Sequence, residues 1–317
     1  MLYFFVTPEH AYTFSTFLSE WSSARFKKLA HIVTYDNVPL IKDMMPGTFI
    51  FSDLDRLNRF QTKVLEDFCE QLAAADEDIP IINHPRTVLG RFDFLRRLHD
   101  KGINQFNVYP VSDLDCKPRY PVFLRMDNDH KGPLSHLQYN SRQRDTKILQ
   151  VSMSGFDTNH MLQVEFCNTR SGDGFYRKYS AFRFGDQIIA AHMIFAKNWI
   201  AKDGTPPDEL TKKESEKYLK ENPHAEAIYE IFELAGITYG RIDYSMLDNT
   251  IQTWEINTNP ILLKSRGKYT VEVTEIKEQL ARRIEEGFLA MEYGGAEGLG
   301  PEVNRRIQFQ WDARNFL

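Results

Sequence analysis

The chain has 317 residues, of which 42% are hydrophobic and 26% charged, and its formal net charge is −5. This composition is typical of a globular protein with a sizeable core, and the acidic balance argues against a nucleic-acid partner. No apolar run approaches the roughly 20 residues needed to cross a membrane. The three cysteines, Cys69, Cys116 and Cys167, lack metal-ligand spacing and indicate free thiols in a reducing compartment. We therefore expect a cytoplasmic protein without a nucleic-acid or membrane partner.

The first 82 residues alternate between strand and helix patterns. The apolar start lacks the basic segment of a signal peptide and indicates a buried strand. The expected strands are Leu2–Thr7, Gly47–Phe51 and Ile79–Ile82, and the expected helices are Pro8–Trp21 and Leu54–Ala74. Such alternation favours an α/β lobe built on a parallel sheet.

The remainder begins with a helical connector over residues 83–109 and continues with a strand-rich stretch. The expected strands are Tyr120–Arg125, Met161–Cys167, Phe175–Phe184 and Gln187–Phe195. A helix over Ala225–Leu234 is expected to stop at Gly236, and a long helix is expected over Val271–Tyr293. The tail from Gln308 mixes aromatic and charged residues and is expected to pack on the body or on a partner.

Two adjacent runs, Ile237–Met246 and Thr250–Asn257, predict a hairpin that carries three oxygen-bearing side chains. Residues two apart on a strand share a face, so Asp243 would lie beside Arg241 and roughly opposite Glu255, with Asn257 on the same face as Glu255. Carboxylate and amide oxygens suit Mg²⁺ or Mn²⁺. The alternative is a surface hairpin with solvated acids, although a bare charge in the apolar strand around Asp243 is costly unless it is paired or metal-bound.

The sequence of this hairpin, G-R-x-D followed by E-x-N-T-x-P, resembles the ATP-grasp superfamily in the style of D-alanine–D-alanine ligase, glutathione synthetase and the ribosomal-protein glutamate ligases. The resemblance implies that Asp243, Glu255 and Asn257 hold Mg²⁺ against the phosphates of ATP. It also implies that Arg241 stabilises the charge that develops when a carboxylate attacks the γ-phosphate. The expected fold is therefore α/β: an N-terminal parallel lobe over 1–82 precedes an ATP-grasp region over 83–317. That region would comprise a central lobe of about 110–170, a metal-binding lobe of about 171–292 and a tail.

Weaker similarities to the family lie N-terminal to the hairpin. Arg91 stands where a helix of the family opens with a phosphate-binding lysine, and Arg125 ends a strand where the family again has lysine. Arginine keeps the charge but is a planar fork, so ATP binding is expected with altered phosphate geometry; for Arg125 a surface charge is the alternative. The loop 126–133 takes the place of the glycine-rich phosphate loop with one glycine. Its His130 either contacts a phosphate or an acid substrate or is solvated.

The run Met161–Cys167 resembles the hinge strand of the family, in which backbone groups near Glu165 and Phe166 read the adenine edge. An acidic residue beyond the hinge binds ribose in the family, which makes Asp173 a candidate. A plain Asp-Gly turn at the same place is the alternative.

The next strand carries Ser180 where relatives have an arginine that faces the nucleotide. Lys178 shares that face and is expected to reach the same phosphates, whereas Arg177 and Arg183 point to the opposite face by alternation. His192, among apolar residues of the following strand, is expected to be a satisfied core or edge histidine.

Together these features predict an ATP- and Mg²⁺-dependent ligase that activates a carboxylate as an acyl-phosphate for attack by an amine or thiol. Its expected partners are a small carboxylate, an amine and a second copy of the chain. Two alternatives use the same residues: a phosphotransferase that phosphorylates a hydroxyl, and a non-catalytic nucleotide-binding scaffold. The departures from the family's lysine, glycine and arginine positions favour the scaffold, and the intact Asp-Glu-Asn set argues against it.

Overall fold

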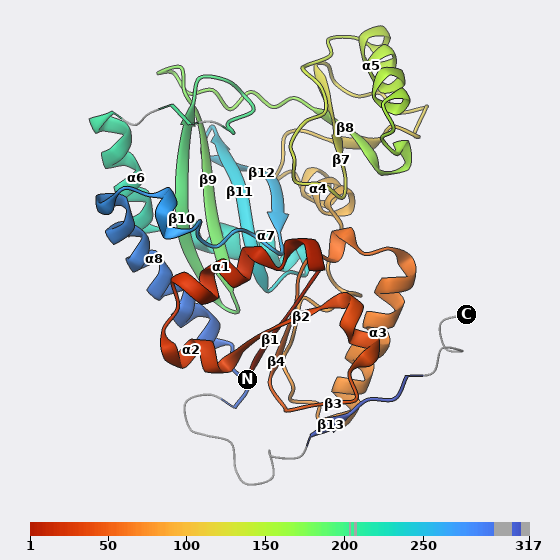
Figure 1. Ribbon diagram of the computed structural model, residues 1–317. Coiled ribbons are helices and arrows are strands. Elements are labelled where there is room, and N and C mark those ends of the chain that lie inside the picture. Colours follow the sequence, from red (N-terminus) through yellow and green to blue (C-terminus); the bar gives the residue numbers. More distant parts are fainter. Residues whose placement is uncertain (203, 206–207, 295–305, 312–317) are drawn as a thin grey trace.

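The computed structural model describes residues 1–202, 204–205, 208–294 and 306–311 (Figure 1). Within this part of the chain, a parallel four-stranded sheet forms the N-terminal lobe, and a three-stranded antiparallel sheet forms a smaller lobe. A four-stranded antiparallel sheet carries most of the C-terminal half. The predicted α/β class is confirmed, with the parallel sheet at the N-terminus where the alternating pattern predicts it.

The N-terminal sheet has the order β2-β1-β4-β5 and buries both of its faces. Its strands are β1 (Leu2–Val6), β2 (Ala30–Thr34), β4 (Thr48–Phe51) and β5 (Ile81–Ile82). Its helices are η1 (Pro8–His10), α1 (Tyr12–Glu20), α2 (Ala24–Leu29), η2 (Tyr35–Leu40), η3 (Leu54–Arg56) and α3 (Arg59–Ala75). Alternate residues of β1 face opposite ways: Phe4 packs against Phe14 of α1, and Phe5 packs against Phe68 of α3.

The two helices predicted in this lobe are each shorter than the sequence pattern suggests. The run from Leu54 is divided because Asn58 and Gln61 form a capping box, each side chain accepting from the other's backbone N–H at 2.9 Å. A reciprocal cap of this kind satisfies two backbone donors and sets the start of α3 at Arg59. Helix α2 and strand β2 are additional, because their short runs carry little periodicity.

The three-stranded sheet has the order β6-β8-β7 and lies between two helices (Figure 1). Its strands are β6 (Val108–Pro110), β7 (Val122–Met126) and β8 (Met161–Glu165), and the associated helices are α4 (Arg91–Asp100), α5 (Ser141–Met153) and η4 (Thr158–His160). Leu95 of α4 packs with Val164 on one face. Val151 of α5 packs with Leu124 on the other. Helix α5 is not among the predicted elements.

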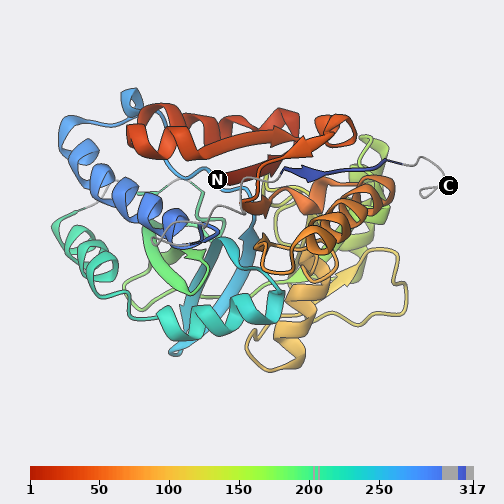
Figure 2. The same ribbon diagram turned by 90° about the horizontal axis from the view of Figure 1, so that it is seen from below.

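The C-terminal sheet has the order β10-β9-β11-β12, and α6, α7 and α8 lie around it (Figure 2). Its strands are β9 (Tyr176–Phe184), β10 (Gln187–Ala196), β11 (Tyr239–Leu247) and β12 (Thr250–Asn257). The helices are α6 (Glu209–Glu221), α7 (Ala225–Ala235), η5 (Arg266–Lys268) and α8 (Val271–Ala290). Gly236 ends α7 at φ +66°, and a Cβ there would come within 2.2 Å of the Thr87 carbonyl, so the predicted stop is confirmed.

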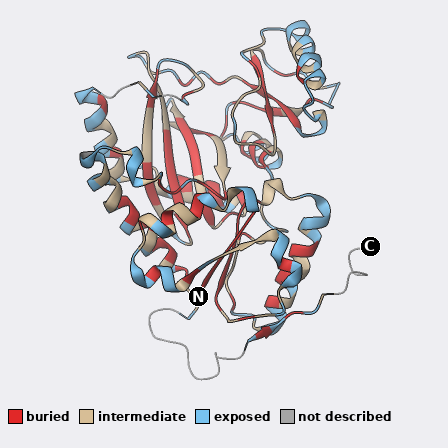
Figure 3. Cartoon of the chain, in the orientation of Figure 1, coloured by how far each residue is buried: buried red, intermediate tan, exposed pale blue. Residues whose placement is uncertain are grey.

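The strands of the sheets are largely buried (Figure 3), and the N-terminal lobe and the C-terminal half share one hydrophobic cluster. Phe4 and Phe14 of the N-terminal lobe lie in one cluster with Phe184, Tyr239 and Phe288 of the C-terminal half. None of the helices in the described residues has the length and apolar character of a membrane span. The boundary at residue 82 therefore stays a prediction, since the core is continuous across it.

The described part of the tail returns to the N-terminal lobe. Strand β13 (Ile307–Gln308) pairs antiparallel with β3 (Asp43–Met44), and Phe309 stacks on Phe68 with ring centroids 4.6 Å apart. Of the two places expected for the tail, residues 306–311 thus take the body of the protein; residues 295–305 and 312–317 lie outside the described part.

Candidate functional site

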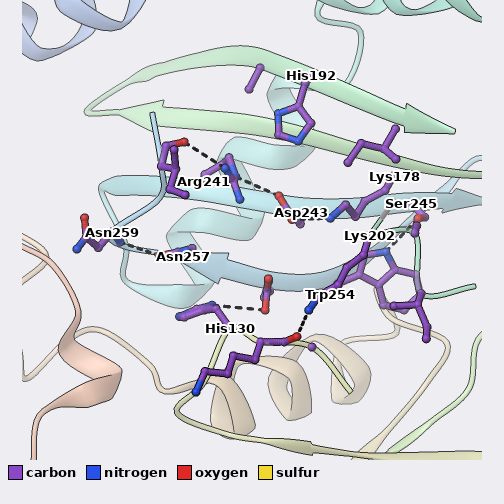
Figure 4. Close-up of a pocket in the computed structure, with 18 of the residues that line it drawn as sticks. His130, Lys178, His192, Lys202, Arg241, Asp243, Ser245, Trp254, Asn257 and Asn259 are labelled. Atoms are coloured by element: carbon purple, nitrogen blue, oxygen red, sulfur yellow. Dashed lines mark hydrogen bonds and ion pairs between the residues drawn. The ribbon is translucent and has the colours of Figure 1, made fainter. Parts of the chain in front are cut away.

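A cavity of about 770 Å³ lies where the three lobes meet (Figure 4). Arg56 reaches it from the N-terminal lobe, Arg125 from the small sheet, and Asp243 from the C-terminal sheet. Helices α6 and α7 cover one face of the C-terminal sheet, and the cavity lies on the other face. Tyr179 and Tyr244 point to the helices, whereas their neighbours along the strands point to the cavity.

A row of polar side chains crosses all four strands of this sheet under the cavity. The strand register places His192 beside Ser180, Ser180 beside Asp243, and Asp243 opposite Glu255, as the hairpin predicts. Ser180 Oγ donates to Asp243 Oδ1 at 2.7 Å and lies 3.0 Å from His192 Nε2. A hydroxyl has one proton to donate, so His192 must supply the proton of the second contact from Nε2. Burial and the charge of Arg241 lower the pKa of His192 to about 3, and its imidazole is therefore neutral.

The two outer strands of the sheet, β10 and β12, each contain a β-bulge, so more of their side chains face the cavity than on regular strands. On β12 the register steps from Asp243–Glu255 to Tyr244–Thr253, which leaves Trp254 as an extra residue. Trp254 and Glu255 therefore both line the cavity, although neighbours on a regular strand would face opposite ways. The Trp254 indole donates to Ser245 Oγ at 2.9 Å, which fixes its orientation.

The Asp243 carboxylate is held by residues of its own sheet. Arg241 Nε lies 3.2 Å from Oδ1, and Lys178 Nζ lies 3.2 Å from Oδ2 (Figure 4). Burial by itself would raise the pKa of Asp243, but Arg241 and Lys178 outweigh it and hold that pKa below its ordinary value. Lys178 thus reaches the site, and Arg177 instead pairs with Glu214 of α6 on the opposite face, as predicted.

The Glu255 carboxylate is held by residues of other lobes. Arg125 Nη2 donates to Oε2 at 2.7 Å and Arg91 Nη2 at 3.0 Å, with His130 Nδ1 3.6 Å away. Burial acts to raise the pKa of Glu255, but the hydrogen bond with His130 and the charges of Arg125 and Arg91 set it well below the ordinary value. Among the described residues, none donates a hydrogen bond to Oε1 of Glu255.

His130 joins this end of the row to the N-terminal lobe. Its Nε2 lies 3.0 Å from Asp55 Oδ2, and its Nδ1 faces Glu255. Burial acts to lower the pKa of His130, but the hydrogen bonds to the two carboxylates raise it above its ordinary value. His130 is thus held by two side chains of the chain itself and is not a solvated loop residue, and its contact with a phosphate or an acid substrate stays a prediction.

Arg91 lies beside the cavity rather than in its lining, and its predicted contact with phosphate stays a prediction. Its guanidinium does not line the cavity; it lies 5% exposed behind the loop 126–133, where Nη1 donates to the carbonyls of Met126 and Asp129 at 2.9 Å. The fork geometry of arginine allows several carbonyls to be gathered at once, whereas a lysine could not span them in one plane. Arg91 therefore shapes the loop that the family forms with glycines.

The side chains of the two predicted hinge residues are placed differently, and the predicted contact of their backbone with adenine stays a prediction. Phe166 lines the cavity, and its ring lies 5.7 Å from that of Trp199. The Glu165 side chain turns away and accepts from the backbone N–H groups of Arg119 at 2.7 Å and Asn107 at 3.2 Å. Its side chain thus holds the connecting segments in place.

Asp173 is not among the residues that line the cavity, and its predicted contact with ribose stays a prediction. It sits in a turn in which Gly174 N donates to Ser171 O, and it pairs with Arg177 at 2.6 Å. Because Arg177 faces the side of the sheet opposite to Lys178, Asp173 is carried to that side as well. The alternative Asp-Gly turn is what the structure shows.

Several cavity residues were not anticipated from the sequence. Trp199 comes from the segment after β10, and its ring lies 4.9 Å from Phe123, so the cavity has an aromatic end beside the hinge. Asn259 donates to Asp53 at 2.7 Å and thereby ties the hairpin motif to the N-terminal lobe. Asn259 could have been predicted as a cavity residue, because it lies two residues after Asn257 within the same motif.

The cavity is strongly cationic although the chain is acidic overall. Three carboxylates line it: Asp129, Asp243 and Glu255. Eight lysine and arginine side chains line it: Arg56, Arg125, Lys131, Lys178, Lys202, Arg241, Lys264 and Lys277. An excess of cations in a concave site selects anionic ligands.

The oxygen donors of the hairpin fit a hard divalent cation. Asp243 and Glu255 face each other across β11 and β12, and Asn257 lies in the next row, where its Oδ1 accepts from Asn259 N at 2.8 Å. Among the described residues, no group of three His, Cys, Asp or Glu side chains could enclose a metal by itself. Mg²⁺ is usually held by one or two carboxylates with phosphate oxygens completing its shell, and the open Oε1 of Glu255 suits that arrangement.

Comparison with protein-family models and with curated proteins gave no match. Solved structures are similar in fold. D-alanine–D-alanine ligase from Bacillus anthracis complexed with ATP is 12% identical at a TM-score of 0.46, over 90% of this chain and 98% of that one. A RimK domain ATP-grasp protein from Sphaerobacter thermophilus is 12% identical at 0.44, over 91% and 100%.

N5-carboxyaminoimidazole synthase from Aspergillus clavatus, in complex with ADP and 5-aminoimidazole ribonucleotide, is 12% identical at a TM-score of 0.49, over 86% of this chain and 72% of that one. Likeness at this identity concerns the fold.

Proposed function

We propose that this chain is an ATP- and Mg²⁺-dependent ligase of the ATP-grasp type, which joins a carboxylate to an amine through an acyl-phosphate. The observation that carries the proposal is the facing pair Asp243 and Glu255, surrounded by cations in the middle of one cavity. The aromatic end of that cavity suits a flat base, and its cationic middle suits a chain of phosphates.

The nucleotide would lie along the cavity from the hinge toward the N-terminal lobe. Phe123, Phe166 and Trp199 provide the apolar walls that a purine ring requires. Lys178 and Arg125 flank the two carboxylates and would take phosphate oxygens when the nucleotide enters. Both cations are already held in place by an acid, so little side-chain entropy remains to be lost on binding.

Asp243, Glu255 and Asn257 would hold Mg²⁺, which would neutralise phosphate charge during transfer. Arg241 lies in the row next to Asp243, on the side of the N-terminal lobe. It contacts the Asp243 carboxylate through Nε. Its position between the acids and the remaining cavity suits a group that stabilises charge as the acyl-phosphate forms.

A covalent protein intermediate has no good candidate among the cavity residues described. Ser180 is fully buried and is not among the residues that line the cavity, so its hydroxyl is not placed to attack a substrate. Cys167 lines the cavity, but burial raises the pKa of its thiol to about 11, so it is not a thiolate at neutral pH. Direct transfer of phosphate from the nucleotide to the substrate carboxylate needs no such group.

The first test is binding of the nucleotide. Mg-ATP should raise the melting temperature of the protein, and more than ATP with a chelator does, because a ligand that binds only the folded state stabilises it by mass action. At a concentration of about 100 times the dissociation constant the gain is about 2.7 kcal/mol. Absence of any shift at millimolar Mg-ATP would refute the proposal.

The second test is the reaction. ADP release should require both an acid and an amine, and mass spectrometry should find their condensed product. A stable phosphorylated product without condensation would identify a phosphotransferase instead. Binding of Mg-ATP without ADP release over a broad panel of acids, amines and alcohols would favour the scaffold.

A further inference from the structure

The buried side of α8 carries a regular stripe of apolar residues and one charged residue. Leu280, Ile284 and Phe288 recur at helical spacing and are buried between α8 and the sheet. Lys277 takes the next position of the same stripe toward the helix start, where the stripe leaves the core and reaches the cavity. A leucine there would continue the pattern, so the lysine needs an explanation other than helix packing.

The ammonium group of Lys277 has no acidic partner among the described residues. Burial lowers the pKa of Lys277, and no neighbouring carboxylate counteracts it. Lys277 and Arg241 both line the cavity. Arg241 pairs with Phe182 in the strand register, and Lys277 lies one helical turn from Leu280, which is buried in the same cluster as Phe182, so the two cations border the same part of the cavity. A partly desolvated cation without a counter-charge favours an anionic ligand.

The walls around Lys277 are mainly apolar. Phe182 and Ala191 come from the sheet, Leu280 from α8, and Leu262 and Leu263 from the segment after the hairpin. This end of the cavity therefore offers space for an apolar body beside two cations.

None of the carboxylates that line the cavity is free to pair with a ligand beside Lys277. Asp243 is already bound by Arg241, Lys178 and Ser180. Glu255 lies on the far strand and pairs with Arg125, and Asp129 belongs to the loop 126–133. Among the described residues, a substrate ammonium group placed beside Lys277 would find cations and apolar walls but no free acid.

We propose that the acid substrate is an apolar carboxylic acid without an ammonium group, whose carboxylate binds between Lys277 and Arg241. The inference rests on the proposed ligase function and specifies the substrate class for the same cavity. α-Amino acids would be poor acids for this site because their ammonium group would be desolvated next to two cations. They remain suitable as the amine partner, which must be neutral to attack.

The test is calorimetric titration of the protein with matched ligands, in the presence of Mg²⁺ and a non-hydrolysable ATP analogue. Isovalerate is compared with valine and isovaleramide, and hydrocinnamate with phenylalanine, so that each acid has a partner that differs by one ammonium group. At least one acid should bind about tenfold or more tightly than its amino counterpart, as expected for a charged contact. The neutral amide should also bind more weakly than its acid.

Lys277→Met removes the charge and keeps the length of the side chain. It should weaken binding of the acid about tenfold or more and leave binding of the ATP analogue unchanged. The matched control is Lys268→Met, an exposed lysine of the neighbouring segment, which should alter neither. Without ligand, Lys277→Met should melt no lower than the parent, because an unpaired, partly buried charge is replaced by an apolar group.

The outcomes separate this inference from the function on which it rests. If the nucleotide binds but the amino acids bind as tightly as the acids, or if Lys277→Met keeps full affinity for the acid, the inference is wrong and the ligase proposal stands. A strongly lowered melting temperature of Lys277→Met would also overturn it, since the lysine would then be structural. If no acid of either pair binds while the nucleotide does, the assigned class is wrong.

Discussion

The two facing carboxylates of the cavity are stabilised in different ways. Asp243 is bound by Arg241, Lys178 and Ser180, all of them on its own strand or on the neighbouring one. Glu255 is bound by Arg125 and Arg91, which come from the small lobe and from α4, 130 and 164 residues away in the sequence. One half of the site is thus built by the sheet alone, and the other half exists only when the lobes are assembled.

The difference lies in the solvent access of the cations as well as in their origin. The side chains of Arg241 and Lys178 are 19% and 20% exposed, so each can turn toward the cavity if its acid is lost. Those of Arg91 and Arg125 are 5% and 11% exposed, so the cations around Glu255 are more deeply buried than those around Asp243. We expect the Asp243 half to respond locally to substitution and the Glu255 half to respond through the whole fold.

The largest expected effect is on turnover when either acid is neutralised. Asp243→Asn and Glu255→Gln should each abolish ADP release, because both remove a proposed metal ligand with little change of shape. The two variants should differ in stability. Glu255→Gln removes the carboxylate that pairs with two buried guanidinium groups, a change that costs about 3 to 5 kcal/mol, and Asp243→Asn should cost less. Urea denaturation of both variants measures the difference.

Asp248→Asn is the matched control for this pair. Asp248 is an exposed acid in the turn of the same hairpin, at φ +47°, a conformation that asparagine adopts readily. It should keep both turnover and stability. Wild-type turnover in the doubly neutralised variant would remove both acids from the site, and equal stability losses in the two single variants would contradict the comparison of the halves.

Substitution of the arginines should have a smaller effect. Loss of Arg241 in the Asp243 half should lower the rate of catalysis, and loss of Arg125 in the Glu255 half should weaken the binding of Mg-ATP. Arg241→Ala should lower kcat about a hundredfold, or about 3 kcal/mol, with little change in ATP affinity, because its contact strengthens as charge develops. Arg241→Lys should restore only part of this, since a point charge lacks the fork. Arg125→Met should weaken Mg-ATP binding instead, because Arg125 flanks the ground-state phosphates and positions Glu255.

Steady-state kinetics with direct Mg-ATP titration separates the two arginine outcomes. An Arg241→Ala variant that is stable, binds ATP and has an unchanged kcat would exclude Arg241 from the chemistry. An Arg241→Ala variant that melts much lower and binds metal poorly would make it a structural partner of Asp243.

The locally built half is also the part of the site that the sequence predicts well. The turn Asp248–Asn249, with φ of +47° and +64°, fixes the hairpin register from Leu247–Thr250 as far as Tyr244–Thr253 and so brings Asp243 close to Glu255, and the bulge at Trp254 then sets the two acids directly opposite each other. Alternation along β9 correctly divides Lys178 from Arg177. The strands, with an error of a residue or two, and the stop at Gly236 follow from the same short-range patterns.

The other half depends on contacts that short-range patterns do not encode. Arg91 was matched to a phosphate-binding lysine by its place at a helix start, but the loop 35 to 38 residues further along captures it. His130 meets Asp55 across 75 residues, and the bulge that turns Trp254 toward the cavity leaves no mark in the alternation. Asp173 shows the converse: the short-range Asp-Gly pattern predicts the turn in which it lies.

The smallest expected effect concerns His192, which ends the polar row on the Asp243 side. Its pKa of about 3 results from burial first, and then from the charges of Arg241, Lys277 and Lys178, against which Asp243 acts in the opposite direction. The ordinary pKa of histidine is about 6.5, so the unfolded chain takes up a proton below that pH while the folded protein does not. Between about pH 6.5 and pH 3, folding stability should therefore fall as the pH falls.

His192→Gln should remove this dependence, since a glutamine amide can still donate to Ser180 Oγ but does not titrate. Between about pH 7.5 and about pH 5, the wild type should lose about 1 to 2 kcal/mol more of its free energy of unfolding than the variant. The depressed pKa values of Asp243 and Glu255 contribute stability above the ordinary carboxylate range that is lost only at lower pH, and they are common to both proteins. Urea titrations at the two pH values give the comparison directly. Equal losses in the two proteins would mean that His192 takes up its proton in the folded state, and the neutral end of the Asp243 half would then have to be reassigned.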